Sequence, residues 1–226
     1  MTGHPRRLVG QSPATPGIAF NRPVDTWTAI VPIRSLHTGK SRLTGRPDLF
    51  ALTESFARDV LAACANCPEI DEVIVVTSDP QVVELAEQCG ARGLLQAPPE
   101  GINEAIAQGR AASREGSPVV AILGDTPCLT GAVLTTVLAA ATEHDVSFVA
   151  DTAGTGSTIW CSRIPGATSH FGHHSRAHHR AMGAVELGSD QRGEHWLRAR
   201  RDVDTAIDLW DAQRIGVGPA TNRTLS

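Results

Sequence analysis

The sequence predicts an α/β protein of three layers, in which a mixed, mostly parallel central sheet lies between two layers of helices. Three observations predict this fold class. The chain has 226 residues, of which 41% are hydrophobic, enough for one sizeable core. Short apolar runs alternate with helical patterns from Trp27 to Glu143, which is typical of parallel strands joined by crossover helices. After Glu143 the alternation loosens, so we expect part of the sheet to be antiparallel.

The first half of the pattern gives four strands and four helices. The run WTAIVPI at Trp27–Ile33 is apolar throughout, which favours a strand that is buried on both faces. The run EVIVVT at Glu72–Thr77 is rich in β-branched residues, which also favours a strand. Two shorter strands are expected at Gly93–Gln96 and Val119–Leu123. The intervening helices are expected at Leu49–Ala65, Gln81–Cys89, Ile102–Ser113 and Gly131–Glu143.

The second half has shorter elements and longer connections. Strands are expected at Ser147–Ala150, Thr158–Cys161 and Arg201–Val203, and helices at Arg176–Met182 and Thr205–Ile215. Residues 1–25 contain four prolines and scattered polar groups, so we expect a disordered or loosely docked extension. Residues 26–221 are predicted to form a single domain, and residues 222–226 a tail.

Composition excludes several classes of protein. A net charge of −4 argues against a protein that binds nucleic acids or membrane surfaces. Arg6-Arg7 is followed at once by Gly10 and Pro13, so no secretory signal is indicated and we expect a cytoplasmic protein. The five cysteines are unevenly spaced and are expected to be reduced thiols.

Charged residues of both signs follow the predicted strands. In open α/β sheets, ligands bind beyond the carboxyl ends of the strands. The cations at this edge are Arg34, Lys40 and Arg42, and the carboxylates are Asp125, Asp202 and Asp204. Because carboxylates repel phosphates, their joint presence indicates a divalent ion such as Mg²⁺ between the carboxylates and a phosphorylated substrate.

The stretch from Phe148 to Leu187 contains a second candidate site. Gly154-Thr155-Gly156 suits a tight turn, and Ser175 precedes a short helical run. Backbone N–H groups that converge at such a turn bind anions, and Ser175 is expected to be the helix N-cap. An ordinary capped turn is the alternative.

Histidines and cysteines offer a competing interpretation. Five of the nine histidines are His170, His173, His174, His178 and His179. The spacing of His174 and His178 in a helix, or of Cys64 and Cys67, is compatible with Zn²⁺. The alternative is a set of partly solvated, partly protonated histidines beside an anionic ligand.

A series of motifs resembles the 2-phospho-L-lactate / phosphoenolpyruvate guanylyltransferases. The resemblance covers Trp27 to Thr221, and its motifs occur in the family's order. They are Ile30–Arg34 with Lys40–Leu43, Gly101–Ile106, Leu123–Leu129, Phe148–Asp151, Gly154–Thr158, Phe171-Gly172 with Ser175, Gly183–Leu187, Asp202–Thr205 and Gly216–Thr221.

The resemblance implies a Rossmann-like, MobA-like nucleotidyltransferase fold, related to that of the molybdopterin-guanine transferases. It implies an enzyme that joins GTP to phosphoenolpyruvate, giving enolpyruvoyl-2-diphospho-5'-guanosine and pyrophosphate in coenzyme F-420 biosynthesis. 2-Phospho-L-lactate or 3-phosphoglycerate is an alternative acceptor. Another MobA-like nucleotidyltransferase, a nucleotide-binding module without turnover and a zinc-dependent interaction protein remain open. The labile product implies transient coupling to a transferase that consumes it.

The resemblance also assigns residues. It implies that Mg²⁺ is held by Asp125, Asp202 and Asp204, and that the acceptor acid is bound by Ser157, Gly172 and Ser175. It places Arg34, Lys40 and Arg42 at the triphosphate and Gly101 and Asn103 at the nucleoside, with Lys40, Arg42 and Asp125 as the catalytic groups. The sequence departs from the family's pattern at Arg34 (lysine), Ser157 (threonine) and His173-His174 (proline and an acid).

Overall fold

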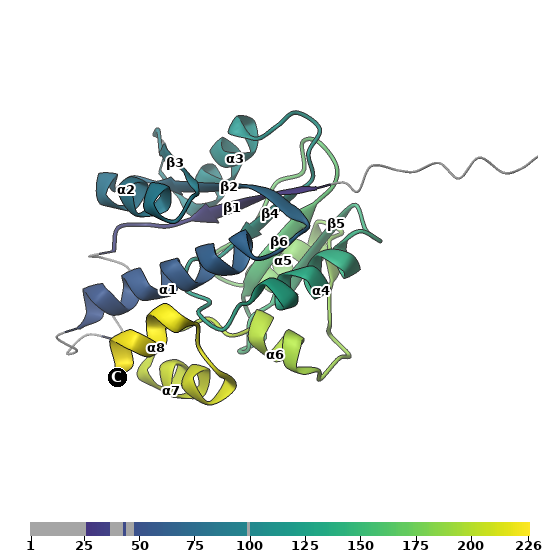
Figure 1. Cartoon of the computed structure of the whole chain (residues 1–226). Helices are drawn as coiled ribbons and strands as arrows, with labels where there is room; N and C mark the ends of the chain where they lie inside the picture. The colour runs from purple at the N-terminus through teal and green to yellow at the C-terminus, as the bar shows by residue number, and fades with distance from the viewer. Residues whose placement is uncertain (1–25, 37–42, 44–47, 99) are drawn as a thin grey trace, which may run out of the picture.

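The computed structural model describes residues 26–36, 43, 48–98 and 100–226. It contains one seven-stranded sheet with helices on both faces (Figure 1). The strand order is β3-β2-β1-β4-β6-β5-β7. Neighbouring strands among β3, β2, β1 and β4 are parallel, β6 is antiparallel to both neighbours, and β5 and β7 are parallel. The predicted fold class, a mixed and mostly parallel sheet, is confirmed.

Most predicted elements are present within one or two residues of their expected bounds. The strands are β1 (Trp27–Pro32), β2 (Ile70–Thr77), β3 (Arg92–Leu95), β4 (Val119–Ile122), β5 (Val146–Ala150), β6 (Ser157–Ser162) and β7 (Val185–Glu186). The helices are α1 (Leu49–Ala65), α2 (Pro80–Gln88), α3 (Ile102–Ala112), α4 (Gly131–Ala141), α5 (Ser175–Ala181), α6 (Glu194–Ala199), α7 (Ala206–Ile215) and α8 (Pro219–Leu225).

The central strand β1 shows why its sequence is apolar throughout. Ala29, Val31 and Ile33 pack in a cluster with residues of α1, α2 and α4 on one face of the sheet. Ile30 points to the opposite face and packs in a second cluster with residues of α3. Successive side chains of a strand alternate between faces, so a strand that is covered on both sides has no polar face.

The C-terminal residues pack against α1 rather than forming a tail. The buried carboxylate of Asp59 in α1 accepts hydrogen bonds from the backbone N–H groups of Ala220 (2.8 Å) and Thr221 (2.9 Å), at the start of α8. Two of the donors that every helix leaves unpaired are thereby satisfied. Residues 222–225, which were predicted to lie in the tail, belong to α8.

The expected strand at Arg201–Val203 is absent from this part of the sheet. No strand is assigned to this segment, and the Val203 N–H donates to the backbone oxygen of Asp125 (3.0 Å). The thiols of Cys64 and Cys67 are buried, and burial raises their pKa values to about 12 and about 11. Protonated thiols are poor zinc ligands. Among the described residues, no helix is long and apolar enough to cross a membrane.

Candidate active site

A cavity of about 620 Å³ lies where the carboxyl ends of β1, β2, β3 and β4 meet. The residues that follow each strand form its walls, among them Arg34 after β1, Ser78 after β2, Gln96 after β3 and Asp125 after β4. This is the position at which open α/β sheets bind their ligands.

The start of α3 forms another wall of the cavity. Gly101, Ile102 and Ala105 line it, and the side-chain amide of Gln96 donates to the backbone oxygen of Gly101 (2.8 Å). Helix α3 approaches the sheet closely at Gly109, where a Cβ would lie 2.6 Å from Cγ2 of Ile30. A side chain at this position would force Ile30 to shift, so the glycine allows the close approach of α3 to the sheet.

Asn103 was expected at the nucleoside, but its side-chain amide forms hydrogen bonds with the loop that contains Ser169 and Phe171. Its Oδ1 accepts hydrogen bonds from the backbone N–H of Phe171 (2.8 Å) and the hydroxyl of Ser169 (2.9 Å), and its Nδ2 donates to the backbone oxygen of Phe171 (3.0 Å). Asn103 therefore holds the segment that leads to Gly172, and it is not among the residues that line the cavity.

The charges of the other two predicted metal ligands, Asp125 and Asp204, act on Asp202, and so does the charge of Asp151. Burial raises the pKa of Asp202 to about 7, with further contributions from the negative charges of Asp125, Asp204 and Asp151. Asp125 and Asp204 also line the cavity. Burial, together with the like charges around it, therefore disfavours the ionised form of Asp202.

This donor set has the chemistry of a Mg²⁺ site without being a complete cage. Within the described ranges, no three His, Cys, Asp or Glu side chains are grouped closely enough to hold a metal ion. Mg²⁺ in nucleotide enzymes is commonly bound by one or two carboxylates together with water and substrate phosphates. A site that is completed by its substrate is consistent with both observations.

The predicted cations are described only in part. Arg34 is exposed and lies on the cavity wall. Lys40 and Arg42 lie outside the described residues. The histidine alternative gains no support, since no group of three metal ligands occurs in the described part of the chain.

The Gly154–Gly156 turn does not present its N–H groups to a ligand. The two carboxylate oxygens of Asp151 accept hydrogen bonds from the backbone N–H groups of Thr155 (2.9 Å) and Gly156 (2.8 Å). The expectation of an open anion site formed by these donors is wrong for this conformation, because Asp151 occupies it.

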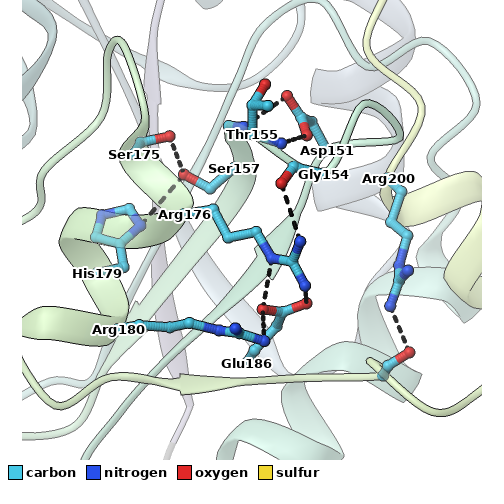
Figure 2. Close-up of polar contacts among 12 residues, drawn as sticks. Asp151, Gly154, Thr155, Ser157, Ser175, Arg176, His179, Arg180, Glu186 and Arg200 are labelled. Carbon is cyan, nitrogen blue, oxygen red and sulfur yellow. Dashed lines mark hydrogen bonds and ion pairs between the residues drawn. The ribbon is translucent and has the colours of Figure 1, made fainter.

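Ser157, Ser175 and His179 form a buried hydrogen-bonded cluster (Figure 2). The two serine oxygens are 2.9 Å apart, and Nδ1 of His179 lies 3.2 Å from Oγ of Ser157. Ser175 is the first residue of α5, and the N-cap is His174 in the left-handed conformation (φ 57°). The predicted capping role of Ser175 is therefore wrong, since its hydroxyl contacts Ser157.

An arginine–glutamate network holds this cluster against the turn. Arg176 of α5 forms two hydrogen bonds with Glu186 of β7 (2.8 and 3.0 Å) and a third with the backbone oxygen of Gly154 (2.9 Å) (Figure 2). Arg180 pairs with Glu186 at 2.7 Å. Burial would raise the pKa of Glu186, but the hydrogen bond and charge of Arg176, aided by Arg180, hold it below its usual value.

Gly172 lies in a backbone conformation that favours glycine. Its φ of +125° favours glycine, and a Cβ at this position would meet no protein atom within 4 Å. Any substitution there acts through backbone strain as well as through a ligand. Gly172 is exposed, whereas Ser157 and Ser175 are buried and do not line the cavity.

Sequence reasoning gave Asp151 no role in the site and expected His179 only as one of several partly solvated, partly protonated histidines beside the ligand. That expectation is wrong for His179, which is 1% exposed and whose pKa is lowered by burial to about 4. Asp151 directly follows β5, so it stands at a strand end, where functional residues are sought. His179 is four residues after Ser175 and hence on the same face of α5. Both signals were present, but neither shows that these side chains reach Asp202 or Ser157.

Comparisons with known proteins agree with the geometry. Residues 36–204 match the model of the MobA-like NTP transferase domain. A phosphoenolpyruvate guanylyltransferase of Streptomyces coelicolor is 41% identical over 203 residues, covering 86% of this chain and 93% of that protein. One from Salinispora arenicola is 39% identical, with coverage of 86% and 91%.

Solved structures show the same fold at low sequence identity. A nucleotide-diphospho-sugar transferase from Desulfovibrio desulfuricans, itself named by inference, aligns with a TM-score of 0.57 and 15% identity, covering 81% of this chain and 84% of that one. A nucleotidyl transferase from Methanothermobacter thermautotrophicus aligns with a TM-score of 0.55 and 16% identity, with coverage of 84% and 98%.

Proposed function

This chain belongs to the phosphoenolpyruvate guanylyltransferase family within the MobA-like NTP transferases, and we propose that it is a cytoplasmic enzyme that joins GTP to phosphoenolpyruvate. The similarity to relatives that carry this name over most of both chains is the observation that carries the proposal. The cavity at the carboxyl ends of the parallel strands supports it, because it places cationic and acidic groups on one rim.

The reaction balances without a general base. A phosphate oxygen of phosphoenolpyruvate attacks the α-phosphorus of GTP, a new P–O–P bond forms, and the bond to the β-phosphate breaks to release pyrophosphate. The attacking phosphate is already ionised at neutral pH. Both reactants are anions, so the protein has to position them and to offset their mutual repulsion.

The residues divide this work by location. Arg34, with Lys40 and Arg42, is assigned to the triphosphate, and Gly101 to the nucleoside side of the cavity. Asn103 is assigned to the loop between the nucleotide and the acceptor, through its hydrogen bonds to Phe171. Ser157, Gly172 and Ser175 are assigned to the acceptor.

We assign Mg²⁺ to the carboxylates of Asp125, Asp202 and Asp204. The raised pKa of Asp202 supports this, since a cation would relieve the repulsion among the acidic groups. When bound, Mg²⁺ supplies positive charge that offsets the charge on the phosphates. Asp151 is an additional carboxylate whose charge contributes to the same repulsion.

The product's diphosphate linkage joins a nucleoside to an enolpyruvoyl group and is labile. We therefore propose a transient encounter with the transferase that consumes it in coenzyme F-420 biosynthesis.

Release of pyrophosphate tests the proposal directly. GTP, ATP and CTP are each supplied with phosphoenolpyruvate, 2-phospho-L-lactate or 3-phosphoglycerate in the presence of Mg²⁺. We expect the fastest release with GTP and phosphoenolpyruvate, and none when the acceptor is omitted. A clear preference for 2-phospho-L-lactate or 3-phosphoglycerate would identify the alternative acceptor. No acceptor-dependent release from any nucleotide would refute the proposed function.

A further inference from the structure

The hydrogen bonds around His179 define which of its ring nitrogens carries the proton. The backbone N–H of His170 donates to Nε2 of His179 (2.9 Å), so Nε2 has to offer its lone pair. Burial, with the charges of His170 and His178, lowers the pKa of His179 to about 4, which makes the ring neutral at pH 7. A neutral imidazole whose Nε2 is unprotonated carries its proton on Nδ1. Nδ1 therefore donates a hydrogen bond to Oγ of Ser157.

This tautomer changes what the two serines can do. The ring proton and the two hydroxyl protons make three donors, and the cluster uses two of them, one between His179 and Ser157 and one between the serines. The third proton belongs to one of the hydroxyls and meets no acceptor within the described residues. With the opposite tautomer, Ser157 would donate to Nδ1 and Ser175 to Ser157, and no donor would remain.

We propose that His179 is a positioning residue for the acceptor acid, which acts by orienting the Ser157–Ser175 pair so that one hydroxyl donates to a carboxylate or phosphate oxygen of that acid. This inference rests on the proposed function. His179 is itself 1% exposed, so it acts through the serines and does not touch the acceptor.

The surroundings of the cluster agree with a positioning role. The segment that supplies the His170 N–H is held to α3 by Asn103, through Ser169 and Phe171. The rings of Phe148 and Phe171 pack against the His179 ring, with centroids 5.2 and 5.4 Å away. The imidazole is thus fixed in place by apolar packing as well as by hydrogen bonds.

The serine pair lies beneath the Gly154–Gly156 turn in this conformation. Ser157 and Ser175 are 4% and 1% exposed, and a Cβ at Gly156 would lie 3.7 Å from Oγ of Ser175. The backbone N–H of Arg176 donates to the oxygen of Thr155 (3.2 Å) and joins α5 to the turn. An acceptor that reaches the hydroxyls therefore has to displace part of this turn.

Two substitutions test the roles of the two ring nitrogens separately. The amide of His179→Asn reaches the position of Nδ1 and retains a donor to Ser157. The longer His179→Gln reaches the position of Nε2 and retains an acceptor for the His170 N–H, but it loses the donor to Ser157. We expect His179→Gln to raise the KM for phosphoenolpyruvate about tenfold or more, with GTP affinity unchanged. The KM of His179→Asn should stay much closer to that of the wild type.

A background without the Ser157 hydroxyl shows whether the effect passes through the serines. In Ser157→Ala, we expect His179→Gln to raise the acceptor KM by less than threefold, because the hydroxyl that receives the ring proton is already absent. A fully additive effect, or equal acceptor KM values in the Asn and Gln variants, would overturn the proposal.

Nitrogen NMR of the ¹⁵N-histidine-labelled wild-type protein tests the premise without turnover. We expect the signals of His179 to show a protonated Nδ1 and an unprotonated Nε2 at pH 7. The opposite tautomer, or a charged ring, would overturn the inference whether or not the enzyme is active. Failure of the proposed function appears differently, as an absence of acceptor-dependent pyrophosphate release in the wild type while the tautomer is as expected.

Discussion

The backbone N–H of Val203 donates to the carbonyl oxygen of Asp125 at 3.0 Å, and this hydrogen bond joins two parts of the acidic cluster. Asp125 follows β4, whereas Val203 lies in a segment outside the sheet. Asp202 and Asp204 flank Val203, so the bond holds both carboxylates at the end of β4. This hydrogen bond therefore holds the segment next to the end of β4, although the segment forms no strand.

Asp125→Asn tests the catalytic role of the first carboxylate. The substitution keeps the backbone oxygen that binds Val203 and removes one negative charge at nearly constant volume. We expect kcat to fall by a factor of roughly 100 or more, because the charge proposed to bind Mg²⁺ is lost, with little change in thermal stability. Turnover close to wild type at saturating Mg²⁺ would remove Asp125 from the site.

Arg34→Ala tests the cationic wall of the cavity. Arg34 is exposed, and a charge-assisted hydrogen bond to phosphate would be worth about 1.5–3 kcal/mol. We expect the KM for GTP to rise roughly 10- to 100-fold while the acceptor KM changes little, with Arg34→Lys in between. Lys40→Ala and Arg42→Ala, outside the described residues, carry the same expectation.

A matched control for these variants lies on β3. Arg92 is exposed and pairs with Glu72 at 3.3 Å, and it is not among the residues that line the cavity. Arg92→Ala should leave both KM values unchanged. If the Arg34 variants raise only the acceptor KM, the first loop contacts the acceptor and not the nucleotide.

The sequence predicted the long and strongly apolar helices and strands well. Helix α1 has the bounds that its apolar periodicity indicates, and β1 differs from expectation by one residue. These elements are long or strongly apolar, so their local pattern agrees with their burial. The edge strand β7 has only two residues, too few for any pattern to be visible.

Helix α8 shows what local pattern cannot reveal. Its sequence PATNRTL contains few strong helix formers, and the carboxylate that caps it lies 161 and 162 residues earlier in the chain. The same limit applies to the candidate site. A strand end indicated Asp125, but the partners of Asn103 lie 66 to 68 residues later in the chain and depend on a contact between distant segments.

Asp59→Asn tests whether the α1–α8 contact is structural. The buried carboxylate accepts two backbone hydrogen bonds at the start of α8, and an amide has only one oxygen for them. We expect the free energy of unfolding to fall by about 1–3 kcal/mol, with kcat unchanged below the unfolding transition. Asp79→Asn is the control, because Asp79 caps α2 through a single exposed hydrogen bond, and it should cost less than about 1 kcal/mol. Equal losses in the two variants would contradict the special role of Asp59.

Asp202 makes the stability of the metal-free protein depend on pH. Its pKa is about 7 in the folded chain and 3.8 in a model peptide, so between these values the folded state holds a proton that the unfolded state has released. Stability from this group is therefore present below about pH 4 and lost as pH rises towards 7. Asp202→Asn has no such proton, so we expect it to exceed the wild type in stability by about 1–3 kcal/mol at pH 8 and to match it near pH 4.

Calorimetry of both proteins across this range, with and without Mg²⁺, measures the effect. The difference between the wild type and Asp202→Asn cancels the contributions of other titrating groups. One of these is His179, whose lowered pKa makes both proteins less stable as pH falls from about 6.5 to about 4. Mg²⁺ at pH 8 offsets the repulsion among Asp125, Asp202 and Asp204, so it should raise the melting temperature of the wild type more than that of Asp202→Asn. A wild type and a variant with the same pH dependence would show that Asp202 is not held protonated by its acidic neighbours. An equal response of both to Mg²⁺ would show that the ion binds without Asp202.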